Sequence, residues 1–108
     1  LYTRTANILS YMSNDMKSWA NHTISNSTFT TRMTDLEDDV TTVRADLAAL
    51  KNIAYPTYVE SINLLDNGLE ACGYALQYAH DFNFTQTLTY SEQAVEYLLR
   101  SARVMPTS

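Results

Sequence analysis

The sequence has few of the residues that form tight turns, with two glycines and two prolines among 108 residues. An all-β sandwich or barrel needs a turn roughly every 8 to 12 residues, so this scarcity argues against one. No apolar run approaches the roughly 18 residues that a membrane-spanning helix requires. The single cysteine, Cys72, excludes an intramolecular disulfide. These absences leave a helical domain as the expected fold class.

Positive charge is also scarce, because 7 Lys and Arg residues stand against 12 Asp and Glu residues and give a formal net charge of -5. Nucleic-acid affinity comes largely from clustered cations, so no nucleic-acid partner is expected. Hydrophobic residues make up 45% of the chain, which is too much apolar material for a disordered segment. We therefore expect a folded domain that does not bind nucleic acid.

The apolar residues that are present recur at the spacing of amphipathic helices. In two long segments they alternate in steps of four and three without a gap, which is the pattern of a heptad repeat. Two further segments show the same pattern with one polar gap each. The four stripes are Tyr2, Leu9, Met12, Met16 and Trp19; Phe29, Met33, Leu36, Val40, Val43, Leu47, Leu50 and Ala54; Tyr58, Ile62, Leu65, Leu69, Cys72, Leu76 and Ala79; and Leu88, Val95, Leu98, Ala102 and Met105. The pattern predicts four helices in one domain spanning residues 1–108.

Capping residues mark two of the expected helix starts. The stretch Ser25–Thr28 is rich in side-chain oxygens that accept hydrogen bonds from first-turn amides, so the second helix should begin there. Thr89 and Glu92 have the spacing of a capping box, which predicts that the fourth helix starts between Thr85 and Thr89.

Pro56 marks the boundary between the second and third helices. A proline disfavours helical torsions at the preceding residue, here Tyr55, and its fixed φ suits the first position of a helix. We therefore expect a tight reversal at this point. The alternative is a three-helix arrangement in which one long helix is kinked at Pro56.

Small residues on the third segment predict a close approach by a neighbouring helix. Ala71, Ala75 and Ala79 follow one another in steps of four beside Gly68. Cys72 lies in the apolar stripe of the same segment, so we interpret it as a small buried hydrophobe.

Four helices joined by short connections most readily form an antiparallel up-down-up-down bundle. In that topology both termini and the reversal at Pro56 lie at one end, and the other two connections lie at the opposite end. Asn-x-Ser/Thr triplets begin at Asn21, Asn26 and Asn83, so these three candidate glycosylation sites are all expected near the end remote from the termini.

The sequence carries none of the motifs that point to catalysis. It has no Glu-x-x-His pair for a di-metal site, no glycine-rich phosphate loop and no Gly-x-Ser-x-Gly elbow. His22, His80 and Asp81 form only a loose trio, whereas a metal needs three or four convergent ligands. We predict a protein that is not an enzyme, with no catalytic residues, no metal and no cofactor.

Four tyrosines fall outside the apolar stripes, and two of them lie one heptad apart on the fourth segment. Tyrosine is common at protein interfaces because its ring is apolar and its tip is polar. The four are Tyr11, Tyr78, Tyr90 and Tyr97. They are candidates for a homodimer surface, and packing on the flanks of the bundle is the alternative interpretation.

The four stripes, from Leu9-Met12-Met16-Trp19 to Leu98-Ala102-Met105, resemble the extracytoplasmic four-helix-bundle sensor domains of prokaryotic membrane receptors. The resemblance implies a cell-surface domain whose two termini continue into transmembrane helices outside this chain. It also implies a small ligand that binds near the membrane-remote end, frequently through arginines. Arg32 and Lys17 are the cations toward that end and become candidate ligand-binding residues, although neither belongs to a family motif.

The leading hypothesis is a non-catalytic extracytoplasmic sensory domain, which binds a small ligand or a protein partner and transmits a helix displacement to a membrane-anchored remainder. The chain starts at Leu1 rather than at methionine, so we expect it to be a piece of a longer protein. The alternative hypothesis is a structural or adhesive cell-surface spacer. The identity of the ligand is left open by the sequence.

Overall fold

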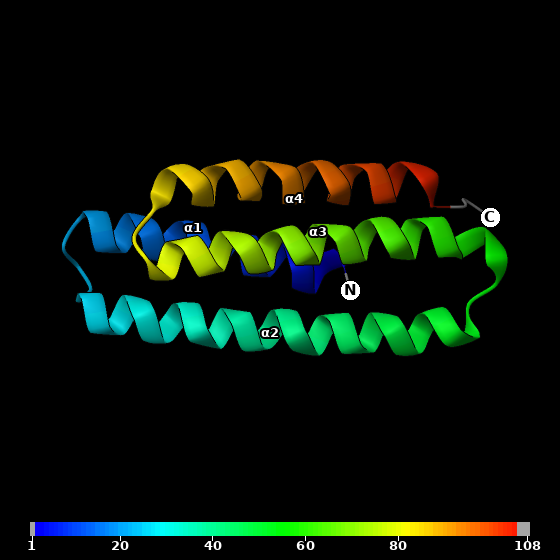
Figure 1. Cartoon of the computed structure of the whole chain (residues 1–108), viewed down its shortest axis with the longest axis horizontal. Helices are drawn as coiled ribbons and strands as arrows, with labels where there is room; N and C mark the ends of the chain where they lie inside the picture. Colours follow the sequence, from blue (N-terminus) through cyan, green and yellow to red (C-terminus); the bar gives the residue numbers. More distant parts are fainter. Residues whose placement is uncertain (1, 106–108) are drawn as a thin grey trace.

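The computed structural model describes residues 2–105, and these residues form four α-helices and no strand. The helices are α1 (Tyr2–Ala20), α2 (Asn26–Ile53), α3 (Pro56–His80) and α4 (Phe84–Val104). They run up and down in turn and give an elongated bundle measuring 47 × 21 × 19 Å (Figure 1). The predicted all-α four-helix bundle is therefore confirmed. None of the helices within residues 2–105 combines the length and the apolar content needed to cross a membrane.

Two of the predicted boundaries are confirmed. Ser25 is the N-cap of α2, and its side chain accepts a hydrogen bond from the Thr28 amide at 3.1 Å. Pro56 is the first residue of α3, while Ala54 and Tyr55 before it have extended backbone torsions. The chain therefore reverses at this point, and the long kinked helix does not form.

The start of α4 was predicted too late. The helix begins at Phe84, and the Asn83 side chain caps it by accepting a hydrogen bond from the Gln86 amide at 3.3 Å. The Thr89 hydroxyl, expected at the helix start, donates instead to the Thr85 carbonyl within the helix. The earlier start has a packing cause, because it brings Phe84 onto Trp19 with ring centroids 5.1 Å apart.

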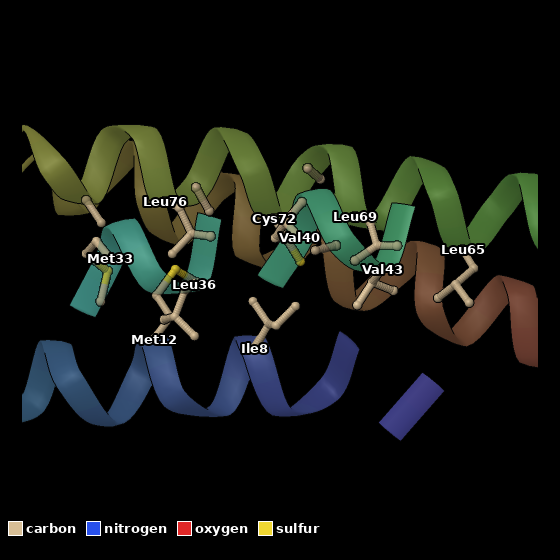
Figure 2. Close-up of a cluster of buried hydrophobic side chains, with 14 of the residues drawn as sticks. Ile8, Met12, Met33, Leu36, Val40, Val43, Leu65, Leu69, Cys72 and Leu76 are labelled. Carbon is tan, nitrogen blue, oxygen red and sulfur yellow. The ribbon is translucent and has the colours of Figure 1, made fainter. Parts of the chain in front are cut away.

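The apolar stripe of α2 faces inward as predicted from Phe29 to Leu47, whereas Leu50, which was expected to continue it, is 41% exposed. Figure 2 shows its side chains between those of α1 and α3. The buried members on α2 are Phe29, Met33, Leu36, Val40, Val43 and Leu47, and those they meet include Ile8 and Met12 of α1 and Leu65, Leu69, Cys72 and Leu76 of α3. One continuous core thus runs along the bundle axis.

The stripe predicted for α4 was partly wrong, because α4 buries its small residues instead of its large ones. Leu88 and Val95 are 57% and 46% exposed, whereas Ala94 is fully buried against α3. The cause is the close approach that the small residues of α3 predicted: a Cβ built on Gly68 would lie 3.3 Å from the Tyr97 Cβ and 3.4 Å from the Ala94 carbonyl oxygen. The small face of α4 therefore turns toward α3, whereas Leu88 and Val95 are exposed and Leu98 is only partly buried against the core.

The helices are not equally well packed. α4 packs most closely on α3, and α1 packs more closely on α2 than on α3. α1 has 19 residues and α2 has 28, so α1 is about 13 Å shorter at 1.5 Å per residue. Figure 1 shows the consequence: the N-terminal end of α1 lies partway along the bundle, short of the α2–α3 reversal.

Candidate functional site

A polar groove lies between α2 and α3 near the middle of the bundle. It encloses about 410 Å³. The lining side chains come from successive turns of the two antiparallel helices: Glu37, Val40, Thr41 and Arg44 on α2, and Glu70, Gly73, Tyr74 and Gln77 on α3. Carboxylate, guanidinium, hydroxyl and amide groups therefore share one surface depression, which makes it a candidate binding site.

Gly73 gives this groove its depth. A Cβ built there would meet only the Val40 Cγ1, at 4.0 Å, so no neighbouring helix requires a glycine at this position. Gly68, five residues earlier, is different because the backbone of α4 lies against it. A glycine inside a helix costs about 0.5–1 kcal/mol relative to alanine. Gly73 thus carries this cost without a packing reason, and it leaves the groove open.

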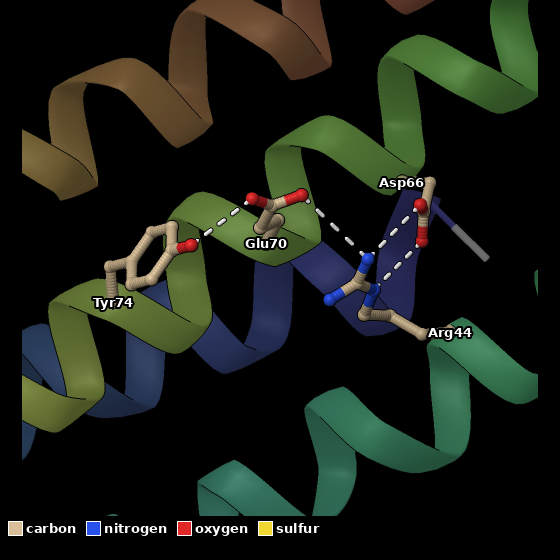
Figure 3. A network of polar contacts seen from close by, with 4 residues as sticks. All are labelled: Arg44, Asp66, Glu70 and Tyr74. Atoms are coloured by element: carbon tan, nitrogen blue, oxygen red, sulfur yellow. Dashed lines mark hydrogen bonds and ion pairs between the residues drawn. The ribbon is translucent and has the colours of Figure 1, made fainter.

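One end of the groove is held by Arg44. Its Nε donates to Asp66 Oδ1 at 2.9 Å and its Nη2 to Asp66 Oδ2 at 3.2 Å, while Glu70 Oε2 lies 3.8 Å from Nη2 (Figure 3). The paired hydrogen bonds to Asp66 raise the pKa of Arg44 above its ordinary value. The bidentate contact therefore fixes the guanidinium and links α2 to α3.

Tyr74 continues this network along α3. Its hydroxyl donates a hydrogen bond to Glu70 Oε1 at 3.2 Å, as Figure 3 shows. This hydrogen bond and the negative charge of Glu70 raise the pKa of the Tyr74 phenol. Glu70 is therefore positioned from both sides, by Tyr74 through one oxygen and by Arg44 through the other.

The opposite end of the groove is marked by Glu37 and His80. Glu37 Oε1 lies 2.7 Å from His80 Nε2, and the same ring nitrogen lies 3.3 Å from the Thr34 hydroxyl. Glu37 Oε1 is shielded from solvent by this contact, while the Glu37 side chain as a whole is 40% exposed. The pair of Glu37 with His80 therefore joins α2 to the C-terminal end of α3 at this end of the groove.

The charges of the groove do not balance. Glu37 and Glu70 in the lining and Asp66 beside it contribute three carboxylates, and Arg44 contributes one guanidinium. These four groups therefore carry a net negative charge and attract cationic groups. Sequence reasoning missed it, although Asp66, Glu70 and Tyr74 follow one another in steps of four on one face of α3.

Lys17 and Arg32, the ligand-binding residues expected from the resemblance, lie outside the polar groove. Arg32 Nη1 donates to Asp15 Oδ1 at 3.0 Å and so joins α2 to α1. Lys17 lines a separate, mostly apolar groove of about 360 Å³ between α1 and α4. The walls of that groove include Leu9, Met12, Met16, Leu88 and Val95.

The four candidate interface tyrosines have different surroundings. Tyr78 and Tyr90 are stacked on each other with ring centroids 5.6 Å apart, and Tyr97 lies under the guanidinium of Arg100 at 5.4 Å. Tyr11 is 55% exposed. Three of the tyrosines therefore already pack within the chain, whereas Tyr11 is mostly exposed to solvent.

The three candidate glycosylation sites lie at the end of the bundle that holds the α1–α2 and α3–α4 turns, as the topology predicted (Figure 1). Asn21 is exposed in the turn between α1 and α2, and the Asn26 side chain accepts a hydrogen bond from Trp19 Nε1 at 2.6 Å. Asn83 caps α4. No group of three His, Cys, Asp or Glu side chains within residues 2–105 is placed to hold a metal ion.

Comparisons of the chain with protein-family models, curated proteins and solved structures found no match.

Proposed function

We propose that the chain is a non-catalytic extracytoplasmic sensory domain that binds a small ligand in the polar groove between α2 and α3. The observation that carries the proposal is the unfilled position at Gly73 between charged groups on both helices. A ligand seated there contacts α2 and α3 together, so its binding energy depends on how far apart the two helices lie.

The packing of α1 and α4 would convert a change in the distance between α2 and α3 into a signal. α1 packs mainly on α2, and α4 packs most closely on α3. A change between α2 and α3 therefore moves α1 relative to α4, and these helices lead to the two ends of the chain. In the proposed receptor the displacement passes to membrane segments outside this chain, and sugars at Asn21, Asn26 and Asn83 face away from the membrane.

A ligand screen on two proteins tests the binding step. Wild type and the Gly73→Leu variant, in which a side chain fills the groove, would be compared by thermal unfolding against amino acids, amines and small carboxylates. We expect at least one compound to raise the Tm of wild type and to have no effect on Gly73→Leu. If every compound that stabilises wild type stabilises the variant equally, the groove is not the ligand site.

A distance measurement tests the signalling step. Ala6→Cys on α1 and Ala102→Cys on α4 place labels at exposed positions, while the native Cys72 is buried. We expect the distance between spin labels to change when the stabilising compound is added, and to stay constant with a compound that the screen found inactive. A bound compound that leaves the distance unchanged would contradict the sensory role.

A structural or adhesive role remains the second proposal, and the exposed apolar residues of α4 are the observation that favours it. Leu88, Val95 and Leu99 form an exposed apolar stripe, and the first two also line the apolar groove between α1 and α4. Such a stripe is typical of a protein contact, and a second copy of the chain is the partner we propose. Sedimentation equilibrium that finds only monomer at high concentration would contradict a homodimer.

A further inference from the structure

We infer that the groove between α2 and α3 takes a linear dication, an α,ω-diamine with an ammonium group at each end. This inference rests on the groove proposed above as the ligand site and specifies the chemical class of its ligand. The groove has carboxylates at both ends, a net negative charge and an uncharged stretch between them.

The carboxylates lie at the two ends of the groove. Glu37 faces His80 across the helices at one end, and Glu70 and Asp66 face Arg44 at the other. Glu37 and Arg44 are seven residues apart on α2, which corresponds to about 10 Å along the helix. Two separate ammonium groups therefore fit the site better than one compact cation.

The middle of the groove suits a chain of methylene groups. Val40 and Gly73 lie there, where a Cβ built on the glycine would be 4.0 Å from Val40 Cγ1. Thr41, Tyr74 and Gln77 complete the lining with uncharged groups. No charged side chain among those lining the groove lies between its two ends on either helix, so an aliphatic linker meets no unpaired charge.

The net charge matches two positive groups. The carboxylates of Glu37, Asp66 and Glu70 and the guanidinium of Arg44 sum to a formal charge of -2. Asp66 forms both hydrogen bonds of the bidentate contact with Arg44, whereas Glu70 Oε2 is only loosely paired at 3.8 Å. Glu70 at one end and the Glu37 carboxylate, whose side chain is 40% exposed, at the other are therefore the acceptors that an ammonium group would use.

Titration calorimetry with a series from 1,3-diaminopropane to 1,8-diaminooctane tests the inference. We expect one-to-one binding that is strongest for a diamine of intermediate or greater length, and at least about tenfold weaker binding of the monoamine of the same length. Glu37→Gln and Glu70→Gln should each weaken the best diamine by about tenfold or more, and Gly73→Leu should abolish its binding.

Glu60→Gln is the matched control, because it removes the same charge from an exposed position of α3 outside the groove. It should bind the diamine as wild type does. If Glu60→Gln weakens binding equally, or if the monoamine and Mg²⁺ bind as tightly as the diamine, the effect is diffuse charge attraction and the inference is wrong. Circular dichroism checks that each variant is folded, and Gly73→Leu tests the site without altering any charge.

The outcomes also separate this inference from the sensory role. Diamine binding that leaves the α1–α4 label distance unchanged overturns the sensory role and keeps the ligand class. A different compound that binds wild type but not Gly73→Leu and changes the distance, with no binding of any diamine, overturns the ligand class alone.

Discussion

At the scale of single residues, the two glycines of α3 have opposite reasons for being there. Alanine at Gly68 would press against the Tyr97 Cβ and the Ala94 carbonyl, whereas alanine at Gly73 would meet only Val40. We expect Gly73→Ala to stabilise the fold by about 0.5–1 kcal/mol, because alanine favours the helix. Gly68→Ala should destabilise it by about 1 kcal/mol or more, because α4 must move away. Urea unfolding measures both, and equal effects would contradict this distinction.

The sequence could predict the close packing at Gly68 but not the absence of a close contact at Gly73. Gly68 belongs to a strip of small residues with Ala71 and Ala75, and that strip indicated close helix packing. Gly73 adjoins the same strip in the sequence and lies on another side of the helix, so nothing in the pattern shows that it is free of contact. Whether Gly73 contacts a neighbouring helix depends on how α2 lies relative to α3. The spacing of residues along the sequence does not give that arrangement.

At the scale of helices, α1 is fastened to the bundle near its N-terminus by a cluster of three hydroxyl groups. The Tyr2 hydroxyl lies 2.8 Å from Ser61 Oγ and 2.6 Å from Ser101 Oγ. The two serines also bond to each other's backbone: Ser61 Oγ donates to the Ser101 carbonyl, and Ser101 Oγ donates to the Ser61 carbonyl. One phenol thus joins α1 to both α3 and α4.

We expect Tyr2→Phe to lower the free energy of unfolding by about 1 kcal/mol, because the serines lose a buried hydrogen-bond partner. Amide hydrogen exchange should become faster first in the N-terminal turns of α1. Tyr58→Phe is the control, since the Tyr58 hydroxyl makes no hydrogen bond within residues 2–105. Faster exchange in α3 rather than α1 would show that the cluster does not fasten α1.

The helices themselves were predictable, but the rotation of α4 was not. Heptad spacing identified all four segments, and Ser25 and Pro56 marked two boundaries. The stripe of α4 was assigned from its large apolar residues. Its buried face is formed instead by the small residues Thr87, Ala94 and Ser101. Close packing against Gly68 therefore overrode the rule that the largest apolar residues face the core.

At the scale of the whole molecule, Cys72 reports on complete unfolding because it is fully buried in the shared core. Burial raises the pKa of its thiol from 9.0 to about 12. The unfolded thiol therefore ionises first, so the stability that this group contributes is fully present below about pH 9 and is lost as the pH rises toward 12. We expect a thiol reagent at pH 8 to label Cys72 only at the rate of unfolding.

Urea unfolding at pH 7 and pH 10, with Cys72→Ala as the control, isolates this contribution. Wild type should lose more stability than the variant between the two pH values. Rapid labelling of the folded protein, or the same pH dependence in both proteins, would contradict the burial of the thiol.

The topology that buries Cys72 was predictable, because the sequence shows four apolar stripes with short connections. The polar groove was not predictable, because it is formed by pairs such as Arg44 with Asp66 that meet only across helices.

The aromatic cluster at the turn end has a practical consequence for observing the molecule. Trp19, the only tryptophan, packs on Phe29, Phe82 and Phe84, and its indole nitrogen donates to the side-chain oxygen of Asn26. Its fluorescence therefore reports on the end of the bundle that holds the α1–α2 and α3–α4 turns. It does not report on fraying of the helices at the opposite end. A sugar attached to the Asn26 amide would adjoin the fluorophore directly, so the native chain already contains an optical probe for modification at that asparagine.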